Sequence, residues 1–244
     1  LKRTKETSHG ARSTQRGNAI MMVFMAIGMA GVVTYGLNTI MRGPAVTAAE
    51  SSRRTIAANN LVATTRLAIT AATRQQTNNG DCDSDGFVEP MPFRAPTTEP
   101  VPVGGGLIPM SVGASMTDPW GNQYGYCVWD PGTVSKSDAF AGCGGAGANR
   151  LQGAPRDDQP AIAVISAGKN GVFETSCNAY VDTTPADNKP DTPLVNKPGT
   201  SDDVVLSYTY AEANGVGGGL WKISQDPLKP NTAEIGMNIK STST

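Results

Sequence analysis

Four acidic residues in one short run are the best candidates in this sequence for binding a ligand. The run reads Asp-Cys-Asp-Ser-Asp-Gly-Phe-Val-Glu over positions 81–89. Aspartates at alternating positions before a glycine let a tight loop turn several oxygens inward, as a hard cation such as calcium requires. Three carboxylates within five residues also repel one another unless a cation lies among them. The sequence therefore predicts a calcium site formed by Asp81, Asp83, Asp85 and Glu89.

The alternative interpretation of this run is an acidic turn held by Asx hydrogen bonds. The run is not an EF-hand, because its twelfth position is Pro92 instead of a bidentate glutamate. A bound cation would reverse the repulsion between the carboxylates. We therefore expect calcium to stabilise the folded chain, with this run as the stronger of two sites.

The cysteines predict two disulfides, since their number is even and an oxidising compartment is expected. Four cysteines allow three pairings. The loop of about 15 residues between Cys127 and Cys143 favours that pair, and Cys82–Cys177 then follows by elimination. A zinc site is not expected, because no two cysteines have C-x₂-C spacing.

The sequence lacks the residue combinations and motifs of common catalytic sites. His9 is the sole histidine, so a serine or cysteine nucleophile has no histidine base outside the first residues. Glycine motifs for phosphate or dinucleotide binding do not occur. The net charge of −1 does not suggest a nucleic-acid partner. We therefore predict that the protein is not an enzyme.

An uncharged apolar run over 19–41 must position the rest of the chain. As a helix it is long enough to cross a bilayer core of about 30 Å. Basic residues precede it, and this bias predicts a cytoplasmic N-terminus with the rest of the chain across the membrane. Gly28 and Gly31 are among the small residues in the run that suit helix–helix contact.

A second helix is expected after the apolar run. Arg42-Gly43-Pro44 predicts a break, because proline removes a backbone donor and clashes with the preceding turn. Residues 45–76 then contain no glycine or proline and are rich in alanine, which favours helix. Asn78-Asn79-Gly80 predicts the end of that helix.

Beyond residue 80, short strand-like runs alternate with proline- and glycine-rich segments. The candidate strands are 123–129, 161–166, 204–210 and, weakly, 220–223. Short strands without intervening helices predict antiparallel pairing, and the outer part of the long helix is the available hydrophobic cover. The predicted fold class is α+β: a long N-terminal helix, with a membrane-spanning half and an amphipathic half, packed on a small antiparallel sheet in a loop-rich domain.

Three motifs resemble type IV pilins and the pseudopilins of type II secretion. Gln15-Arg16-Gly17-Asn18 before the apolar run resembles their leader-peptide signal, although Met22 stands where most members carry glutamate. Residues 118–124 (DPWGNQY) resemble the D-P-W-G-N-P-Y signature of major pseudopilins. Residues 165–171 (ISAGKNG), followed later by Asp202 and Asp203, resemble the family's calcium loop, with Asn170 replacing its aspartate.

The resemblance implies what this chain does and which proteins act on it. A prepilin peptidase would cut between Gly17 and Asn18, and the mature chain would be a structural subunit of a type IV pilus-like or type II secretion filament. Its partners would be identical or homologous subunits, bound through the N-terminal helix, with the inner membrane as its location before assembly and a periplasmic or extracellular filament afterwards. Asp202 and Asp203 would be the weaker calcium site. The alternative function is a signal-anchored binding or adhesion module that does not polymerise.

The expected division of the chain follows from these elements. It comprises a cytoplasmic leader (1–17), a transmembrane or filament-core helix (18–44), an amphipathic helix (45–80), a globular β domain (81–226) and a C-terminal tail (227–244).

Overall fold

The computed structural model describes residues 16–75, 80–82, 85–131, 149–154, 156–183 and 189–221, with the side chains of 16–19 and 32–45 excepted. The chain divides into two compact units, Leu1–Ser51 and Ser52–Thr244. We call the second one the globular unit. The predicted tail (227–244) and most of the predicted leader (1–15) lie outside the described residues.

One uninterrupted helix, α1, runs from Arg16 to Ala72. The predicted break at Arg42-Gly43-Pro44 is therefore wrong, whereas the helix predicted over 45–76 is confirmed up to Ala72. A proline inside a helix removes one backbone hydrogen bond, and the helix-favouring alanines beyond Pro44 continue the element through that position.

Among the described residues, no helix has both the length and the apolar character needed to cross a membrane. The continuous apolar stretch with described side chains covers only residues 20–31, whereas a membrane span needs about 20 apolar residues. This finding corrects three predictions: the membrane-spanning half of the expected fold, the transmembrane helix over 18–44, and the location in the inner membrane.

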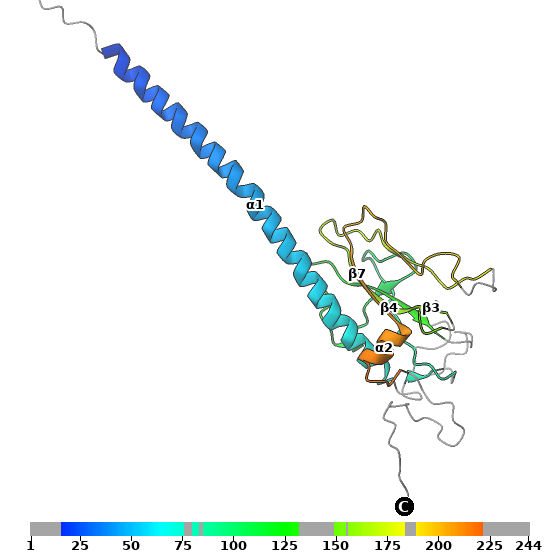
Figure 1. The fold of residues 1–244 in the computed structure, drawn as a ribbon. Coiled ribbons are helices and arrows are strands. Elements are labelled where there is room, and N and C mark those ends of the chain that lie inside the picture. Colours follow the sequence, from blue (N-terminus) through cyan, green and yellow to red (C-terminus); the bar gives the residue numbers. More distant parts are fainter. Residues whose placement is uncertain are drawn as a thin grey trace, which may run out of the picture. The chain divides into compact units, whose positions relative to one another are not determined.

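A small, mostly antiparallel sheet forms the centre of the globular unit (Figure 1). Its strands follow the order β1-β2-β4-β7, with bounds Gly106–Leu107, Gly125–Asp130, Pro160–Ser166 and Val204–Thr209. The strand predictions over 123–129, 161–166 and 204–210 are confirmed by β2, β4 and β7. The expectation of purely antiparallel pairing is wrong at one edge, where β3 (Leu151–Gln152) pairs in parallel with β2.

Smaller elements complete the globular unit. A second sheet pairs β5 (Ser176–Cys177) with β6 (Val195–Asn196). A 3₁₀ turn, η2, covers Met110–Val112. The short helix α2 (Tyr210–Val216) follows β7 directly, and a capping box between Thr209 and Glu212 begins it. At 220–221, within the weakly predicted fourth strand, the chain forms a turn, and the remaining two residues lie outside the described part.

The main hydrophobic core lies between the C-terminal part of α1 and one face of the sheet. Leu61, Ala68, Ile69 and Ala72 of α1 are buried there, at positions three or four residues apart that share one side of a helix. Tyr126 and Val128 of β2 meet them, because alternate residues of a strand point to the same face. This side of the predicted amphipathic half is therefore buried, whereas Val62 is half-buried and Leu67 is 45% exposed.

The opposite face of the sheet carries a second core and a disulfide. Cys127 and Trp129 alternate with Tyr126 and Val128, so they point away from α1. Cys127 is bonded there to Cys177 of β5, with a Cα–Cα distance of 6.3 Å. Both predicted pairs, Cys127–Cys143 and Cys82–Cys177, are therefore wrong.

The pairing differs from the prediction because strand direction, and not sequence separation, decides which cysteines can meet. Cys127 and Cys177 are 50 residues apart in sequence, yet β2 and β5 bring them to the same side of the sheet. Cys82 is also disulfide-bonded. Cys143 lies outside the described residues.

Candidate functional site

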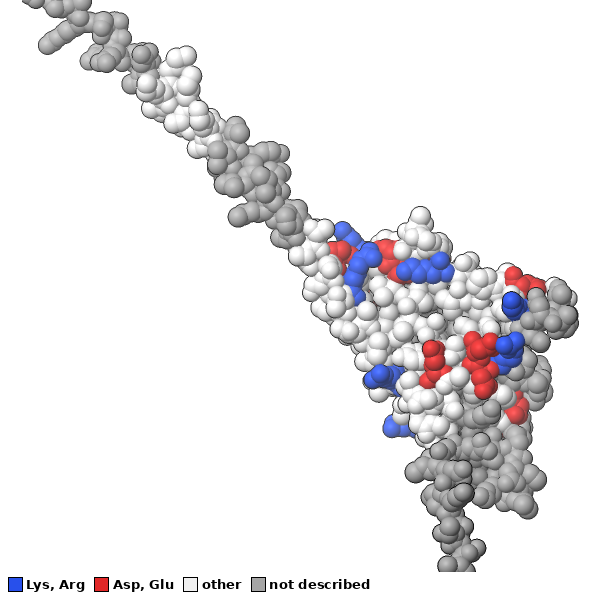
Figure 2. Space-filling view, viewed as in Figure 1, with Lys and Arg blue, Asp and Glu red and all other residues white. Residues whose placement is uncertain are grey.

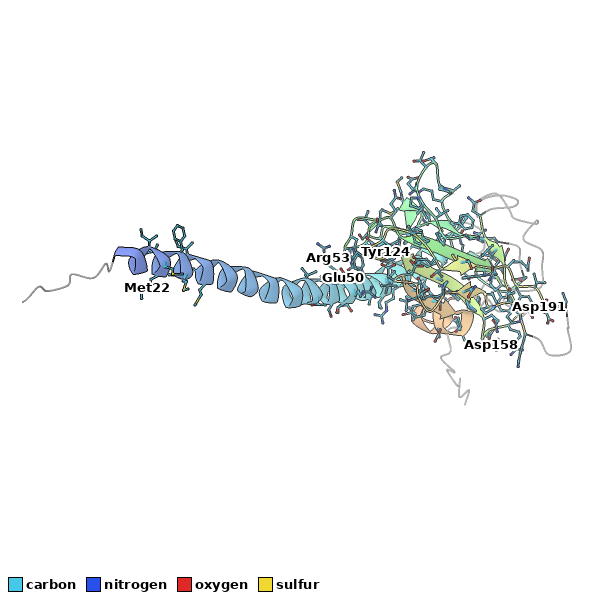
Figure 3. All side chains as sticks on the ribbon, turned by 90° about the horizontal axis from the view of Figure 1, so that it is seen from above. Met22, Glu50, Arg53, Tyr124, Asp158 and Asp191 are labelled. Atoms are coloured by element: carbon cyan, nitrogen blue, oxygen red, sulfur yellow. A yellow bond between two sulfur atoms is a disulfide. The ribbon has the colours of Figure 1, made fainter. Side chains whose placement is uncertain are left out.

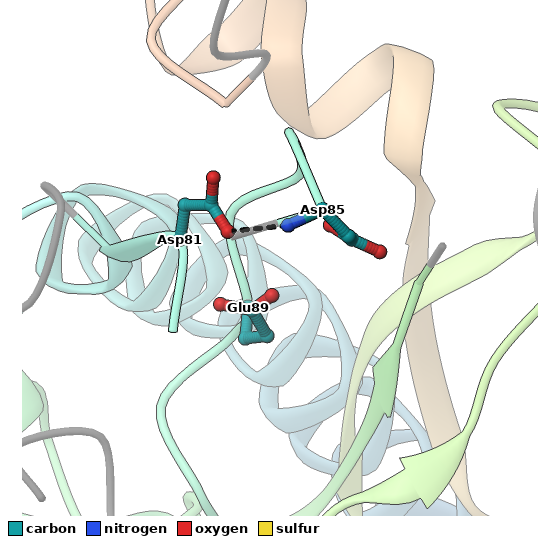
Figure 4. Close-up of side chains that lie close together, drawn as sticks. All are labelled: Asp81, Asp85 and Glu89. Carbon is teal, nitrogen blue, oxygen red and sulfur yellow. Dashed lines mark hydrogen bonds between the residues drawn. The ribbon is translucent and has the colours of Figure 1, made fainter. Parts of the chain in front are cut away.

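The predicted acidic run does form a cluster of carboxylates. Ligand oxygens of Asp81, Asp85 and Glu89 all lie within 4.8 Å of one another (Figure 4), and we call these residues the Asp81 cluster. Two oxygens that bind one calcium ion at 2.3–2.6 Å are at most about 5 Å apart. The spacing therefore fits a single calcium ion. The fourth predicted ligand, Asp83, lies outside the described residues.

Backbone N–H groups of the same loop hold the Asp81 cluster in place. Asp81 accepts from the N–H of Asp85 at 3.1 Å and of Gly86 at 3.2 Å. Glu89 accepts from the N–H of Cys82, and its own N–H donates to the carbonyl of Gly80 at 3.0 Å. These bonds hold residues 80–82 and 85–89 close together, with the Asx-type hydrogen bonds of the alternative interpretation.

Two buried polar side chains tie this loop to the end of α1. Gln75 donates from Nε2 to the backbone carbonyl of Glu89 at 2.7 Å. Arg150, only 5% exposed, donates to the carbonyl of Pro90 at 2.6 Å and to Oε1 of Gln75 at 3.2 Å. A buried guanidinium needs such acceptors, because an unsatisfied charged group is costly in an apolar surrounding. The loop is thus part of the folded core and is not an appendage.

The pKa of Tyr210 reflects the negative charge of the Asp81 cluster. Burial raises the pKa of its phenol, and the negative charges of Glu89 and Asp85 raise it further, whereas the hydrogen bond with the N–H of Val88 lowers it. The phenol also donates to the carbonyl of Trp221, a buried residue whose indole N–H donates to the carbonyl of Ile69. The carboxylates of the Asp81 cluster therefore lie near the buried aromatic side chains of Tyr210 and Trp221. A cation would be strongly attracted to negative charge in such a place.

A second acidic cluster lies elsewhere in the globular unit. It consists of Glu174, Asp202 and Asp203, whose ligand oxygens also lie within 4.8 Å of one another, and we call it the Asp203 cluster. Asp203 is 1% exposed and accepts at Oδ2 from the N–H groups of Glu174 at 3.1 Å and Thr175 at 2.7 Å. Asp202 accepts at Oδ2 from the N–H groups of Lys169 and Asn170.

One oxygen of each aspartate in this cluster is left for another ligand. Oδ1 of Asp202 and Oδ1 of Asp203 are buried and accept no hydrogen bond from the described part of the chain. A buried carboxylate oxygen without a donor costs free energy. Carboxylate oxygens are calcium ligands, and one ligand oxygen of each residue in the cluster lies within 4.8 Å of the others, so these residues fit the calcium site expected from the resemblance.

Glu174 is a candidate ligand that the sequence did not predict. Its carboxylate accepts from the side-chain amide of Asn170 at 2.6 Å and from Ser201 Oγ at 3.1 Å. Asn170 stands where the resembling family has aspartate, and Glu174 supplies a carboxylate at that place. A search for an acidic residue within one turn of the substituted position could have found it.

The two globular-domain motifs are joined to each other. Asp118, from the D-P-W-G-N run, accepts from Ser166 Oγ at 2.7 Å and from the N–H of Asn122 at 2.8 Å. Asn122 in turn donates to the carbonyl of Gly168 at 2.9 Å. The turn thus fixes residues 166–168, which lead into the loop that surrounds Asp202. Its role here is to position the Asp203 cluster.

The N-terminal part of α1 presents a different kind of surface. Its large apolar side chains are each 57–70% exposed: Ile20, Met21, Met22, Val23, Phe24, Met25, Ile27 and Met29. The side chain of Met22 projects outward from the helix (Figure 3). Consecutive apolar positions cover every side of a helix, so no polar face remains for water along this stretch.

Comparisons with known protein families, with curated proteins and with solved structures found no match for this chain. The resemblance to pilins and pseudopilins is therefore not supported by a family match, and it stays a prediction.

Proposed function

We propose that this chain is a structural subunit that assembles with copies of itself into a filament through α1. The exposed apolar side chains over residues 20–29 carry the proposal. Burial of apolar surface contributes about 25 cal/mol per Å², so a helix segment that is apolar on all sides gains stability from any apolar cover. Equivalent segments of neighbouring copies provide that cover.

Two glycines favour a helix from another copy as the cover. A Cβ built at Gly28 or Gly31 meets no atom within 4 Å, so the backbone is open to close approach there. Small residues let two helices approach closely and gain van der Waals contact. This self-assembly is the one that the resemblance to pilins implies, without a membrane-spanning step.

Assembly of the full chain, followed by light scattering and electron microscopy, tests the proposal. Replacing Phe24 and Ile27 by serine should prevent filament formation, because both side chains lie in the apolar segment. A control variant with Val103→Ser and Val172→Ser removes equally exposed apolar side chains, 71% and 56% exposed, from the globular unit. It should assemble normally. A parent chain that stays monomeric would favour the non-polymerising binding module instead.

We also propose calcium as the ligand of the globular unit. The spacing of the carboxylates in both clusters and the two oxygens of Asp202 and Asp203 without donors support it. Calcium would hold the loop after α1 and the loops around Asp203 in one folded arrangement. Calorimetric titration of the full chain with calcium should show binding, and magnesium should bind more weakly because it demands a smaller, octahedral site.

Processing before assembly follows from the same proposal. Gly17 and Asn18 lie in the first turn of α1, and a prepilin peptidase would cut between them. Mass spectrometry of the assembled protein should then find Asn18 as the first residue. An assembled form that keeps residues before Asn18 would contradict processing while leaving assembly itself intact.

A further inference from the structure

We propose that four methionines on one side of α1 form a modification site, where oxidation to the sulfoxide by a peroxide prevents assembly. This inference rests on the proposed self-assembly and adds a means of regulating it. Each of the four side chains is 58–70% exposed, and we call them the methionine face: Met21, Met22, Met25 and Met29. Methionines exposed to this extent are open to a small oxidant in solution.

The spacing of these methionines places them on the same side of the helix. Successive residues of an α-helix are about 100° apart around its axis, so all four lie within an arc of about 100°. Met22 projects outward from the helix (Figure 3). Over residues 20–31 the opposite side has no methionine, and its large side chains are Ile20, Val23, Phe24 and Ile27. A helix that packs on the methionine face therefore contacts mainly thioether side chains.

The segment that contains the methionine face has no polar side chain. Residues 20–31 are all apolar residues or glycine. In Figure 2 this described part of α1 is white on the face shown, so no Lys, Arg, Asp or Glu lies there. A sulfoxide oxygen accepts hydrogen bonds, but between two copies of this segment it would find no side-chain donor. Burial of a polar group without a donor costs free energy, so the oxidised face stays in water.

The unmodified thioether has the opposite preference. Methionine is flexible and polarisable, and it fills irregular apolar contacts. Oxidation changes this flexible apolar side chain into a polar one, which disrupts interfaces rich in methionine. Four such groups on one side of a helix make the change in polarity large for a small chemical step.

The reaction transfers two electrons from sulfur to hydrogen peroxide. The sulfur donates an electron pair to one peroxide oxygen, so an S–O bond forms while the O–O bond breaks. The hydroxide that leaves takes the proton of the transferred hydroxyl and becomes water. Each methionine thus gives one sulfoxide and one water. A methionine sulfoxide reductase reverses the change with electrons from thiols.

Met110 is a matched control for oxidation elsewhere in the chain. It lies in η2 of the globular unit and is 73% exposed. A peroxide should therefore oxidise it as readily as the methionine face. Because Met110 is not on α1, its sulfoxide should leave assembly unchanged.

Treatment of the full chain with hydrogen peroxide before assembly tests the proposal. Light scattering and electron microscopy follow assembly, and peptide mass spectrometry locates the sulfoxides. Treatment should raise the concentration that the parent needs for assembly at least about tenfold, because each buried sulfoxide lacks a donor. The Met110→Leu variant should assemble like the untreated parent and lose assembly on treatment as the parent does.

A leucine variant shows whether the methionine face is responsible. Leucine keeps a similar apolar volume and forms no sulfoxide. The concentration that this variant needs for assembly should be the same with and without peroxide. The variant carries four changes: Met21→Leu, Met22→Leu, Met25→Leu and Met29→Leu.

Three results would overturn the proposal. The treated parent could carry sulfoxides on the methionine face and still assemble normally. Treatment could abolish assembly of the leucine variant, or a methionine sulfoxide reductase could fail to restore assembly of the treated parent. The untreated parent tests the proposed self-assembly separately, because an untreated parent that stays monomeric contradicts self-assembly and this proposal together.

Discussion

The two acidic clusters differ in how the chain builds them. The Asp81 cluster comes from nine consecutive residues, and its carboxylates accept hydrogen bonds from the backbone of the same loop. The Asp203 cluster joins Glu174 to a segment about thirty residues later, and the turn at Asp118 fixes the loop around it. A local cluster follows from a sequence pattern, whereas an assembled cluster depends on the sheet that brings its parts together.

This difference does not reverse the expected ranking of the two sites. The sequence pattern favours the Asp81 cluster as the stronger calcium site. Backbone N–H groups donate to carboxylates in both clusters. These bonds do not separate the two sites, so the greater strength of the Asp81 cluster stays a prediction.

Removing calcium should give the largest change in the stability of the folded chain. If calcium is present at 100 times its dissociation constant, binding to the folded chain alone adds about 2.7 kcal/mol of stability. Thermal unfolding of the full chain with calcium and with chelator measures this gain. Asp85→Asn should abolish most of it, since the amide keeps the shape but loses the charge. Asp203→Asn is the matched control, and a gain that survives Asp85→Asn but not Asp203→Asn would reverse the ranking.

Replacing Gly168, which lies beside Asp202, should give the next largest loss of stability. Gly168 has φ +66°, and a Cβ there would lie 2.7 Å from the carbonyl oxygen of Asp202. Gly168→Ala should cost about 1–2 kcal/mol for the left-handed backbone and more for the close contact. Gly113, with φ +72° and nothing within 4 Å of its Cβ, is the matched control. Chemical denaturation of both variants should show a larger loss in the free energy of unfolding for Gly168→Ala. Equal losses would show that the loop around Asp202 shifts to accommodate the added Cβ at little cost.

Sequence patterns predicted the parts of this fold that depend on local periodicity. The strands β2, β4 and β7 and the buried side of α1 near Leu61 and Ala68 follow from alternation and from three- and four-residue spacing. The Asp81 cluster was likewise predictable, because its ligands are neighbours in the chain. These features need no knowledge of which strands pair.

Features that depend on pairing were not predictable from the sequence. The Cys127–Cys177 disulfide requires β5 to lie over the face of β2 that points away from α1. Glu174 reaches Asp203 only because the loop after β4 returns to the start of β7. The membrane-spanning interpretation of 19–41 was wrong, because no helix among the described residues has both the length and the apolar character needed to cross a membrane.

Asn170→Asp sharpens the comparison by adding a fourth carboxylate to the Asp203 cluster. Without calcium the variant should lose about 1 kcal/mol, since the side chain no longer donates to Glu174, now 2.6 Å from a like charge. With calcium it should bind the ion more tightly, because the added charge favours a cation. Calorimetric titration measures the affinity and thermal unfolding the stability. An affinity that falls would mean that Asn170 serves the site as a donor and not as a substituted ligand.

Glu99 should give the smallest effect and is the baseline for both clusters, because it lies outside them. It is a half-buried carboxylate that pairs with Arg94 at 3.6 Å. Hydrogen bonds donated by the backbone N–H groups of Thr98 and Thr97 and by the hydroxyl of Thr97 lower its pKa from 4.5 to about 2. A depressed pKa means that the ionised form favours folding, so the contribution of Glu99 is complete above pH 4.5 and is lost as the pH falls through about 2. Solvent screening keeps this contribution small. Carbon-detected NMR titration should place the midpoint for Glu99 near that pH with or without calcium. A midpoint for Glu99 that moves with calcium would show that the ion also binds outside the two clusters.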